Sequence, residues 1–133
     1  MVLCGITHED NILDADSLIP KLLKTRLWGA KDNPGQSWAT NVVENDYQIL
    51  LVSQFTLYHQ MKGTKPDFHQ AMANEPAREL YEQFLDKLNT EFLALRAKSK
   101  IQSDKVPVLP GAFGQYMNID TTCDGPVTLV WES

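Results

Sequence analysis

The feature that most constrains the fold is an apolar stretch at residues 47–58 that contains several polar side chains. Its Leu, Val, Phe and Tyr residues predict a buried strand. Because side chains alternate between the two faces of a strand, Gln54 and Thr56 are expected on one face and Ser53 on the other. A buried amide without a hydrogen-bond partner costs about 1–3 kcal/mol. These polar residues therefore either stand at the solvated end of an ordinary strand, in which Thr is a good strand former and Gln marks an edge, or serve a site there.

Helical periodicity predicts two helices. The first follows the capping residues Asp14, Asp16 and Ser17, carries Leu and Ile at helical spacing, and has Pro20 in its first turn. The second begins at Pro76, with Asn74 as its cap, and its apolar stripe is Ala77, Leu80, Tyr81, Phe84, Leu85, Leu88, Phe92 and Leu95.

Four shorter segments are predicted as strands: residues 2–6, 38–43, 115–119 and 127–131. Residues 29–37, around Asn33-Pro34-Gly35, and residues 97–114 are predicted as loops, and a short helical turn is expected near residues 61–76. The chain has 133 residues, of which 43% are hydrophobic, enough for one domain with a real core. The sum is a single α+β domain over residues 1–133, with two helices packed on mostly antiparallel strands.

Charge and cysteine usage exclude several classes of protein. A net charge of −5 argues against a general nucleic-acid binder, so any RNA contact must be local. The only local basic candidates are Lys62, Lys65, Arg96, Lys98, Lys100 and Lys105, and an ordinary solvated surface is the role we favour for them. Cys4 and Cys123 lie far apart, "MVLCGI" is too short for a signal peptide, and no window approaches the ~18 apolar residues of a membrane span. We expect a reducing, cytoplasmic location and no membrane contact.

No pattern predicts a metal ion or a nucleotide cofactor. His8, His59 and His69 do not have metal-ligand spacing, and no CxxC accompanies them. No GxGxxG or GxxxxGK sequence occurs. We therefore expect neither a metal nor another cofactor.

Three stretches together resemble one known family. "LLVSQFTLY", "KGTKPDFHQAM" and "DGPVTLVWES" are similar to the D-aminoacyl-tRNA deacylases, also called D-tyrosyl-tRNA deacylases. "VLCGITHEDNILDADSL" and "FGQYMNI" resemble the family's opening strand and helix and its penultimate strand, so the resemblance spans residues 2–133. We expect the chain to differ from the family in three respects: it lacks the family's N-terminal strand hairpin, its Trp28–Asn45 stretch is only loosely similar, and Cys123 stands where many members have Asn.

The resemblance implies a compact barrel-like fold, a homodimer, and hydrolysis of the ester between a D-amino acid and the 3′ end of tRNA without metal or cofactor. Ser53, Gln54, Phe55 and Thr56 match the family's pocket for the terminal adenosine and the aminoacyl ester. Backbone N–H groups near Phe55 and Thr56 are suited to an oxyanion hole. The family's Gly-cisPro dipeptide matches Gly125 and Pro126, which in the family enter the partner subunit's pocket and reject L-amino acids.

Several roles stay open on the sequence. Thr56 is either a direct nucleophile or, as we prefer because no base is spaced to activate it, a positioning group for water attack assisted by the ribose 2′-hydroxyl. Met117 lines the pocket or packs in the core, and Thr128 is favoured as an ordinary strand residue. Glycine, being achiral, is expected to be accepted, as in glycyl-tRNA mischarged on tRNA-Ala. The alternatives are a DNA-unwinding-element-type binding protein and a related deacylase acting on L-aminoacyl-tRNA.

Overall fold

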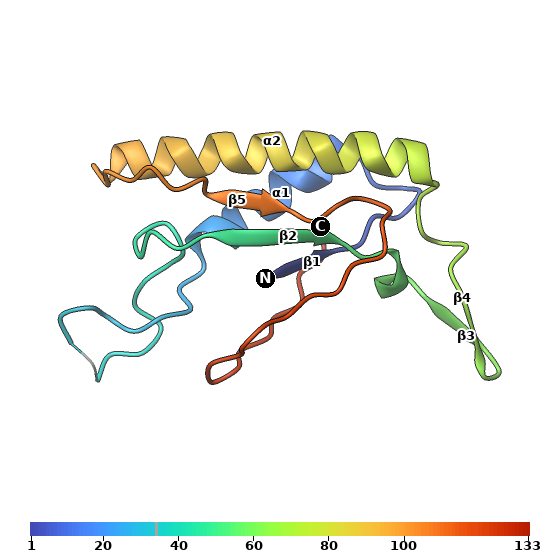
Figure 1. Cartoon of the computed structure of the whole chain (residues 1–133), viewed down its shortest axis with the longest axis horizontal. Coiled ribbons are helices and arrows are strands. Elements are labelled where there is room, and N and C mark those ends of the chain that lie inside the picture. Colours follow the sequence, from blue (N-terminus) through green and yellow to red (C-terminus); the bar gives the residue numbers. More distant parts are fainter. Residues whose placement is uncertain (34) are drawn as a thin grey trace.

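A computed structural model describes residues 1–33 and 35–133 of the chain (Figure 1). Two helices lie against a small central sheet, and a separate hairpin projects from one end. Pro34, in the predicted turn Asn33-Pro34-Gly35, lies outside the described residues. The elements follow in the order β1 (Val2–Cys4), α1 (Ile12–Lys24), β2 (Ile49–Ser53), the 3-10 helix η1 (Phe55–Leu57), β3 (Gln60–Lys62), β4 (Lys65–Asp67), α2 (Asn74–Lys98) and β5 (Val108–Pro110).

The central sheet has the order β1-β2-β5, and both of its strand pairs are parallel. Cys4 pairs with Ser53, and Ile49 pairs with Val108. Parallel neighbours need a long crossover, and here α1 lies between β1 and β2 in the chain while α2 lies between β2 and β5. The two predicted helices are confirmed. The prediction of a mostly antiparallel sheet is wrong for this sheet, and no sheet in the described part of the chain closes into a barrel.

Several predicted strands are shorter than expected or absent. The segment at residues 47–58 forms a strand only over β2, and residues 38–43 contribute a single bridge between Trp28 and Thr40. The predicted loop at residues 97–114 contains β5. Residues 115–119 and 127–131 have no strand, although they carry exposed apolar side chains such as Tyr116 and Val130. High β-propensity alone does not form a strand when no neighbouring strand offers hydrogen bonds.

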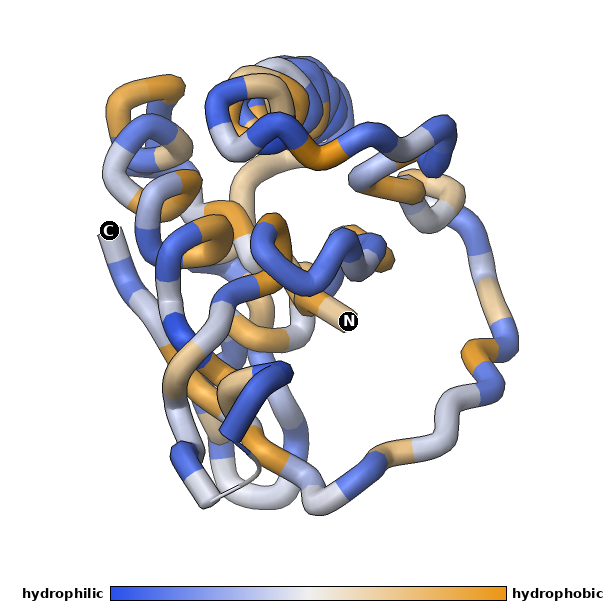
Figure 2. The backbone as a smooth tube through the Cα atoms, turned by 90° about the vertical axis from the view of Figure 1, so that its left-hand side faces the viewer, coloured by the Kyte–Doolittle hydropathy of each residue, from blue (hydrophilic) through white to orange (hydrophobic). Residues whose placement is uncertain are grey.

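The C-terminal segment runs along the outside of the molecule. In Figure 2 the tube that leads to the end marked C makes a wide arc away from the helices before it returns. The segment is held at its end by Lys21 of α1, whose ammonium donates to the Glu132 carbonyl at 2.9 Å.

Helix α1 begins one turn earlier than predicted. Asn11 is the N-cap: its side chain accepts from the Leu13 N–H, and the Asp14 carboxylate accepts from the Asn11 N–H. This reciprocal capping box satisfies two of the N–H groups that a helix start leaves free. Pro20 therefore lies inside the helix rather than in its first turn. Helix α2 also begins earlier than predicted, with Ala73 at the N-cap, so Asn74 is not its cap.

The core lies between the helices and the buried face of β2. Leu51 of β2 is fully buried, and the Tyr81 hydroxyl of α2 donates to its carbonyl at 2.8 Å. The predicted stripe of α2 is confirmed at its centre, with two differences: Arg96 is buried as well, and Leu80, Leu85 and Leu95 are only half-buried. The core residues are Ile6, Ala15, Ile19, Leu23, Val42, Val43, Ile49, Leu51, Tyr81, Phe84, Leu88, Phe92 and Val108.

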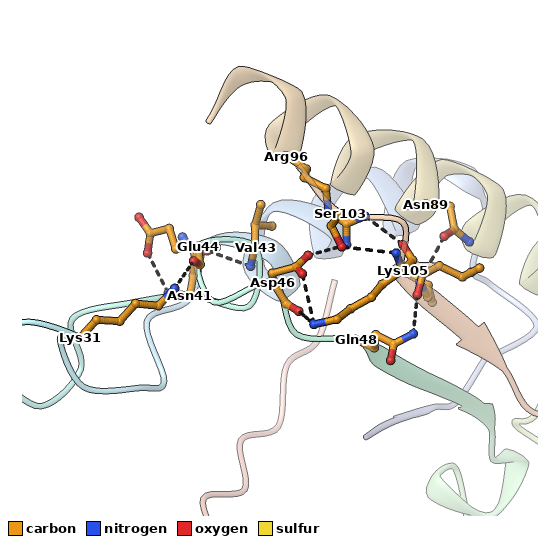
Figure 3. A network of polar contacts seen from close by, with 12 residues as sticks. Lys31, Asn41, Val43, Glu44, Asp46, Gln48, Asn89, Arg96, Ser103 and Lys105 are labelled. Carbon is orange, nitrogen blue, oxygen red and sulfur yellow. Dashed lines mark hydrogen bonds and ion pairs between the residues drawn. The ribbon is translucent and has the colours of Figure 1, made fainter. Parts of the chain in front are cut away.

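A buried ion pair ties the end of α2 to two loops (Figure 3). Arg96 is 4% exposed, and its Nη2 lies 2.9 Å from Asp46 Oδ1 while its Nη1 donates to the Lys105 carbonyl at 2.9 Å. The Lys105 ammonium lies 3.1 Å from Asp46 Oδ2. Partial burial alone raises the pKa of Asp46, but hydrogen bonds from Ser103 and Lys105 and the charges of Lys105 and Arg96 outweigh it and hold this pKa below its ordinary value.

Replacing Asp46 with Asn should lower the melting temperature at pH 7, because Arg96 would stay buried without its counter-charge. Asn tolerates the left-handed backbone at this position, where φ is +53°, so the charge is what changes. A depressed carboxyl pKa stabilises the fold above the unfolded value of about 3.9, and that contribution disappears as pH falls through the folded pKa. The difference in melting temperature between wild type and Asp46→Asn should therefore shrink below about pH 4.

Thermal melting between pH 3 and pH 7 measures this difference. Asp104→Asn, at an exposed position outside the network, is the matched control and should melt close to wild type at neutral pH. A difference that is absent at pH 7, or that stays constant with pH, would contradict the assigned role of Asp46.

Candidate active site

Four of the predicted site residues, from Ser53 to Thr56, lie where β2 ends and the chain turns into η1. The Gln54 N–H donates to the Cys4 carbonyl of β1 at 2.7 Å, and the backbone then enters one turn of 3-10 helix. The strand alternation expected through Thr56 therefore stops at Ser53. The turn is half-exposed, so the polar residues stand at a solvated strand end.

The turn nevertheless brings Gln54 and Thr56 together. The Gln54 side-chain amide Nε2 donates to the Thr56 hydroxyl oxygen. The His59 ring Nδ1 lies 3.0 Å from the Thr56 carbonyl oxygen, not from the hydroxyl. No other side chain in the described part of the chain hydrogen-bonds the Thr56 hydroxyl, so no base is placed there to remove its proton.

The turn also presents unused backbone donors. The first N–H groups of a helix lack partners inside it, and among the hydrogen bonds of the described residues none is donated by the backbone N–H of Phe55 or Thr56. The Phe55 side chain is 57% exposed and meets Phe68 edge to face, with ring centroids 5.0 Å apart. The site thus combines free N–H donors with an exposed aromatic ring.

Gly5 packs closely against Tyr58 and Leu57 beside the turn, and neither Gly5 nor Tyr58 is among the site residues predicted from the sequence. A Cβ on Gly5 would lie 2.8 Å from two Tyr58 ring carbons and 3.1 Å from the Leu57 Cβ. Tyr58 also borders a shallow hollow of about 170 Å³ with Thr7, His8, Glu9 and Gln70. The signal that could have found Gly5 is its position: a glycine at the end of a strand often marks close approach of another segment.

Cys4 lies beside Ser53 in the sheet, but its chemistry does not suit a nucleophile. Burial, with a smaller contribution from the charge of Asp10, raises the pKa of the Cys4 thiol to about 11. The reactive form of cysteine is the thiolate, so Cys4 stays protonated at neutral pH.

The other predicted site residues lie outside this turn. Met117 packs near β2: its Sδ accepts from the Ala112 N–H at 3.2 Å, and its Cε lies 3.2 Å from where a Gly111 Cβ would be. Thr128 and the Gly125-Pro126 dipeptide are exposed. Gly125 has φ of +92°, and a Cβ on it would meet nothing within 4 Å. Figure 1 shows the tip of this red segment on the side away from η1.

The Gly125–Pro126 peptide bond is trans, since no cis bond occurs among the described residues. The expected Gly-cisPro is therefore wrong for this structure. The trans form of an X-Pro bond is favoured by about 0.5–1 kcal/mol unless contacts select the other, and Gly125 has no such contacts within one chain.

Two further observations concern the described residues. No group of three His, Cys, Asp or Glu side chains is gathered there as a metal ion would require. Neither described helix is both long and apolar enough to cross a membrane.

Comparison with known proteins identifies the family. The family model described as "D-Tyr-tRNA(Tyr) deacylase" matches residues 1–132. "D-aminoacyl-tRNA deacylase 1" of Leishmania major is 42% identical over 132 residues, covering 99% of this chain and 79% of the relative. "D-aminoacyl-tRNA deacylase" of Drosophila melanogaster is 41% identical over 132 residues, covering 99% and 75%. The chain belongs to the D-Tyr-tRNA(Tyr) deacylase family. The family predicted from the sequence is therefore confirmed, and so is the prediction that the protein is a deacylase.

Solved structures agree with this fold. The structure titled "c-Myc DNA Unwinding Element Binding Protein" superposes with a TM-score of 0.77 at 36% identity and covers 94% of this chain and 75% of that one. A structure titled as a probable eukaryotic D-amino acid tRNA deacylase has a TM-score of 0.61 at 17% identity, covers 85% of this chain and 72% of that one, and supports the fold alone.

Replacing Gly5 with Ala should destabilise the protein by about 1–3 kcal/mol, because the new methyl overlaps the Tyr58 ring and overpacking costs this much. When Tyr58 is already replaced by Ala, adding Gly5→Ala should cost much less free energy of unfolding than Gly5→Ala costs in the wild type. Urea denaturation measures both free energies of unfolding.

Gly35→Ala is the matched control, since its new Cβ would lie 3.6 Å from Asn33 Oδ1, an ordinary contact. Additive free energies for Gly5 and Tyr58 would show that the two residues do not press on each other.

Proposed function

We propose that the chain hydrolyses the ester bond of D-aminoacyl-tRNA and releases a free D-amino acid and tRNA. The carrying observation is the turn from Gln54 to Leu57, whose two free N–H groups stand at an exposed strand end in a chain that matches the family over residues 1–132. The substrate therefore includes the aminoacylated 3′ end of tRNA. The proposed role is chiral proofreading of translation in the cytoplasm, where aminoacyl-tRNA is consumed.

The proposed chemistry uses backbone donors. Attack on the ester carbonyl places negative charge on its oxygen, and the N–H groups of Phe55 and Thr56 would bind this oxyanion without rearrangement. The Thr56 hydroxyl already accepts from Gln54 and has no base beside it, which supports a positioning role. Water then attacks the carbonyl carbon, assisted by the 2′-hydroxyl of the terminal ribose, and the 3′-oxygen leaves as the tRNA hydroxyl. Ser53 and Met117 would border the bound 3′ end.

In the proposed mechanism, a second copy of the chain supplies the selectivity for D- over L-amino acids. Gly125 and Pro126 are exposed, and a Cβ on Gly125 would meet nothing of its own chain within 4 Å, which supports their reaching the site of a partner in a homodimer. Backbone groups there would meet the Cα substituents of the amino acid, so they would reject the L-hand whatever the side chain. Thr128, two residues beyond Pro126, would support this segment. Glycine has no side chain to reject, so glycyl-tRNA mischarged on tRNA-Ala is included as a second substrate.

Hydrolysis of matched D- and L-aminoacyl-tRNA tests the function. We expect the D-substrate to be hydrolysed at least about tenfold faster, a difference of only about 1.4 kcal/mol in barrier. Gln54→Ala and Thr56→Ala should each lower kcat/KM about tenfold but leave measurable activity, since the backbone donors remain. Thr90→Ala, an exposed threonine of α2, is the matched control.

Three results would refute parts of this proposal. Faster hydrolysis of the L-substrate would favour the related L-specific deacylase. Complete loss of activity in Thr56→Ala would make Thr56 the nucleophile. Full activity on tRNA ending in 2′-deoxyadenosine would eliminate the role of the ribose hydroxyl.

Mixing two inactive variants tests whether each site is formed by residues of two subunits. Thr56→Ala/Gln54→Ala and Gly125→Ala should each be nearly inactive alone, the latter also because Ala is strained at φ of +92°. After the subunits exchange, activity should return to about one quarter of wild type, because about half of the dimers are mixed and each mixed dimer keeps one intact site. No recovery in a mixture shown by mass spectrometry to contain mixed dimers would place both motifs in one chain.

One observation favours a second function, DNA binding: the similarity at 36% identity to the structure titled "c-Myc DNA Unwinding Element Binding Protein". The net charge of −5 weighs against it, because phosphate contacts supply most nonspecific DNA affinity. Filter binding at two salt concentrations discriminates, since tight and strongly salt-dependent DNA binding would support it.

A further inference from the structure

The hairpin formed by β3 and β4 projects from the molecule at the same end as η1 (Figure 1). Its strands pair antiparallel, with Gln60 opposite Asp67 and Lys62 opposite Lys65. The two-residue turn between the lysines begins with Gly63, whose φ of +64° suits glycine. A Cβ on Gly63 would meet nothing within 4 Å, so the tip stands free of the body of this chain.

Two lysines face each other at this tip. Like charges directly opposite on neighbouring strands destabilise a hairpin, so the fold itself gives no reason for this pair. Lys62 Nζ lies 2.6 Å from Asp67 Oδ2, whereas no hydrogen bond or ion pair joins the Lys65 side chain to the rest of the described chain. The single carboxylate of the hairpin pairs with Lys62 and not with Lys65, so the tip keeps a positive charge.

Asp67 is itself shared. It accepts from the His69 N–H at 3.1 Å and contacts the His69 ring as well as Lys62. The hydrogen bonds from Lys62 and from His69 hold the pKa of Asp67 well below its ordinary value, so it stays ionised. Asp67 thereby fixes Lys62 on the hairpin, and Lys65 remains the free cation.

This charge contrasts with the rest of the chain. The net charge of the whole protein is −5, yet residues 55–72 contain only one acidic residue, Asp67, beside Lys62 and Lys65 and two histidines. A positive projection next to the candidate site of an acidic protein suits an anionic partner that reaches beyond that site.

We infer that the Lys62–Lys65 tip binds the sugar-phosphate backbone of the substrate tRNA, beyond its terminal nucleotide. This rests on the proposed function, which places the aminoacylated 3′ end at η1. Three strand residues at about 3.3 Å each put the tip about 10 Å from the start of the hairpin, so the phosphates on the 5′ side of the terminal nucleotide come within reach. Contacts of this kind are independent of base sequence, and they suit an enzyme that acts on many tRNAs.

The test compares a long substrate with a short one. For D-aminoacyl-tRNA, Lys62→Gln/Lys65→Gln should raise KM severalfold at low salt with little change in kcat. The slope of log(kcat/KM) against log[salt] should become shallower by about 1 for each lost phosphate contact. For D-aminoacyl-adenosine, which lacks the phosphates, the same variant should keep the wild-type KM.

Lys98→Gln/Lys100→Gln is the matched control. It removes the same charge from the C-terminal end of α2, at the opposite end of the molecule from the hairpin (Figure 1), and should leave the salt slope unchanged. Lys65→Gln alone, at a position without protein partners, should show part of the effect and keep the wild-type melting temperature.

Equal effects of the two double variants would overturn the inference, and so would an equal loss on the short substrate, which would make the hairpin a support for η1. If wild type hydrolyses neither substrate, the proposed function fails. Binding of uncharged tRNA, measured by fluorescence anisotropy against salt, then decides the hairpin's role separately: an unchanged affinity in Lys62→Gln/Lys65→Gln would refute it.

Discussion

The candidate site depends on how strand β2 is held. Leu51 is fully buried, and its carbonyl receives hydrogen bonds from the Tyr81 hydroxyl at 2.8 Å and the Gly111 N–H at 2.7 Å. Three residues further on, the bond from Gln54 N–H to the Cys4 carbonyl ends the strand against β1. The next residues cannot continue the sheet, so they turn, and the turn leaves two N–H groups without partners. A rigid strand thereby positions a polar turn, which is how functional residues on loops commonly gain precision.

The same strand explains how far the sequence could predict the fold. Burial of α2 follows from a 3.6-residue period, and this stripe is correct from Ala77 to Phe92. The period of a sequence cannot show where a strand becomes a 3-10 turn. Strand alternation predicts that Gln54 and Thr56 are neighbours, and they are, but the 3-10 turn brings them together. The parallel direction of the central sheet was available in principle, since in the chain a helix lies between β1 and β2 and another between β2 and β5.

Other features could not be read from local pattern. The contacts of Gly5 with Tyr58 and of Arg96 with Asp46 join residues far apart in the chain, and a single sequence contains no signal for either pair. Residues 127–131 alternate as a strand would, but in this chain no strand edge lies against them, so propensity was not enough. Propensity describes how a residue fits a sheet, and the sheet's hydrogen-bonding partners decide whether there is one.

Three titratable groups near β2 have raised pKa values. Burial raises the pKa of Cys4 to about 11 and, with a contribution from Cys4, that of Tyr81 to about 12. Burial, followed by the charges of Asp10 and Glu132, likewise raises the pKa of Tyr58. All three groups are therefore neutral at physiological pH, and none is available as a general base. Chemistry carried by fixed dipoles does not require any of these three groups to transfer a proton. The free N–H groups of η1 are dipoles of that kind, and in the proposed mechanism they would bind the oxyanion of any aminoacyl ester, because such a contact does not depend on the amino acid's side chain.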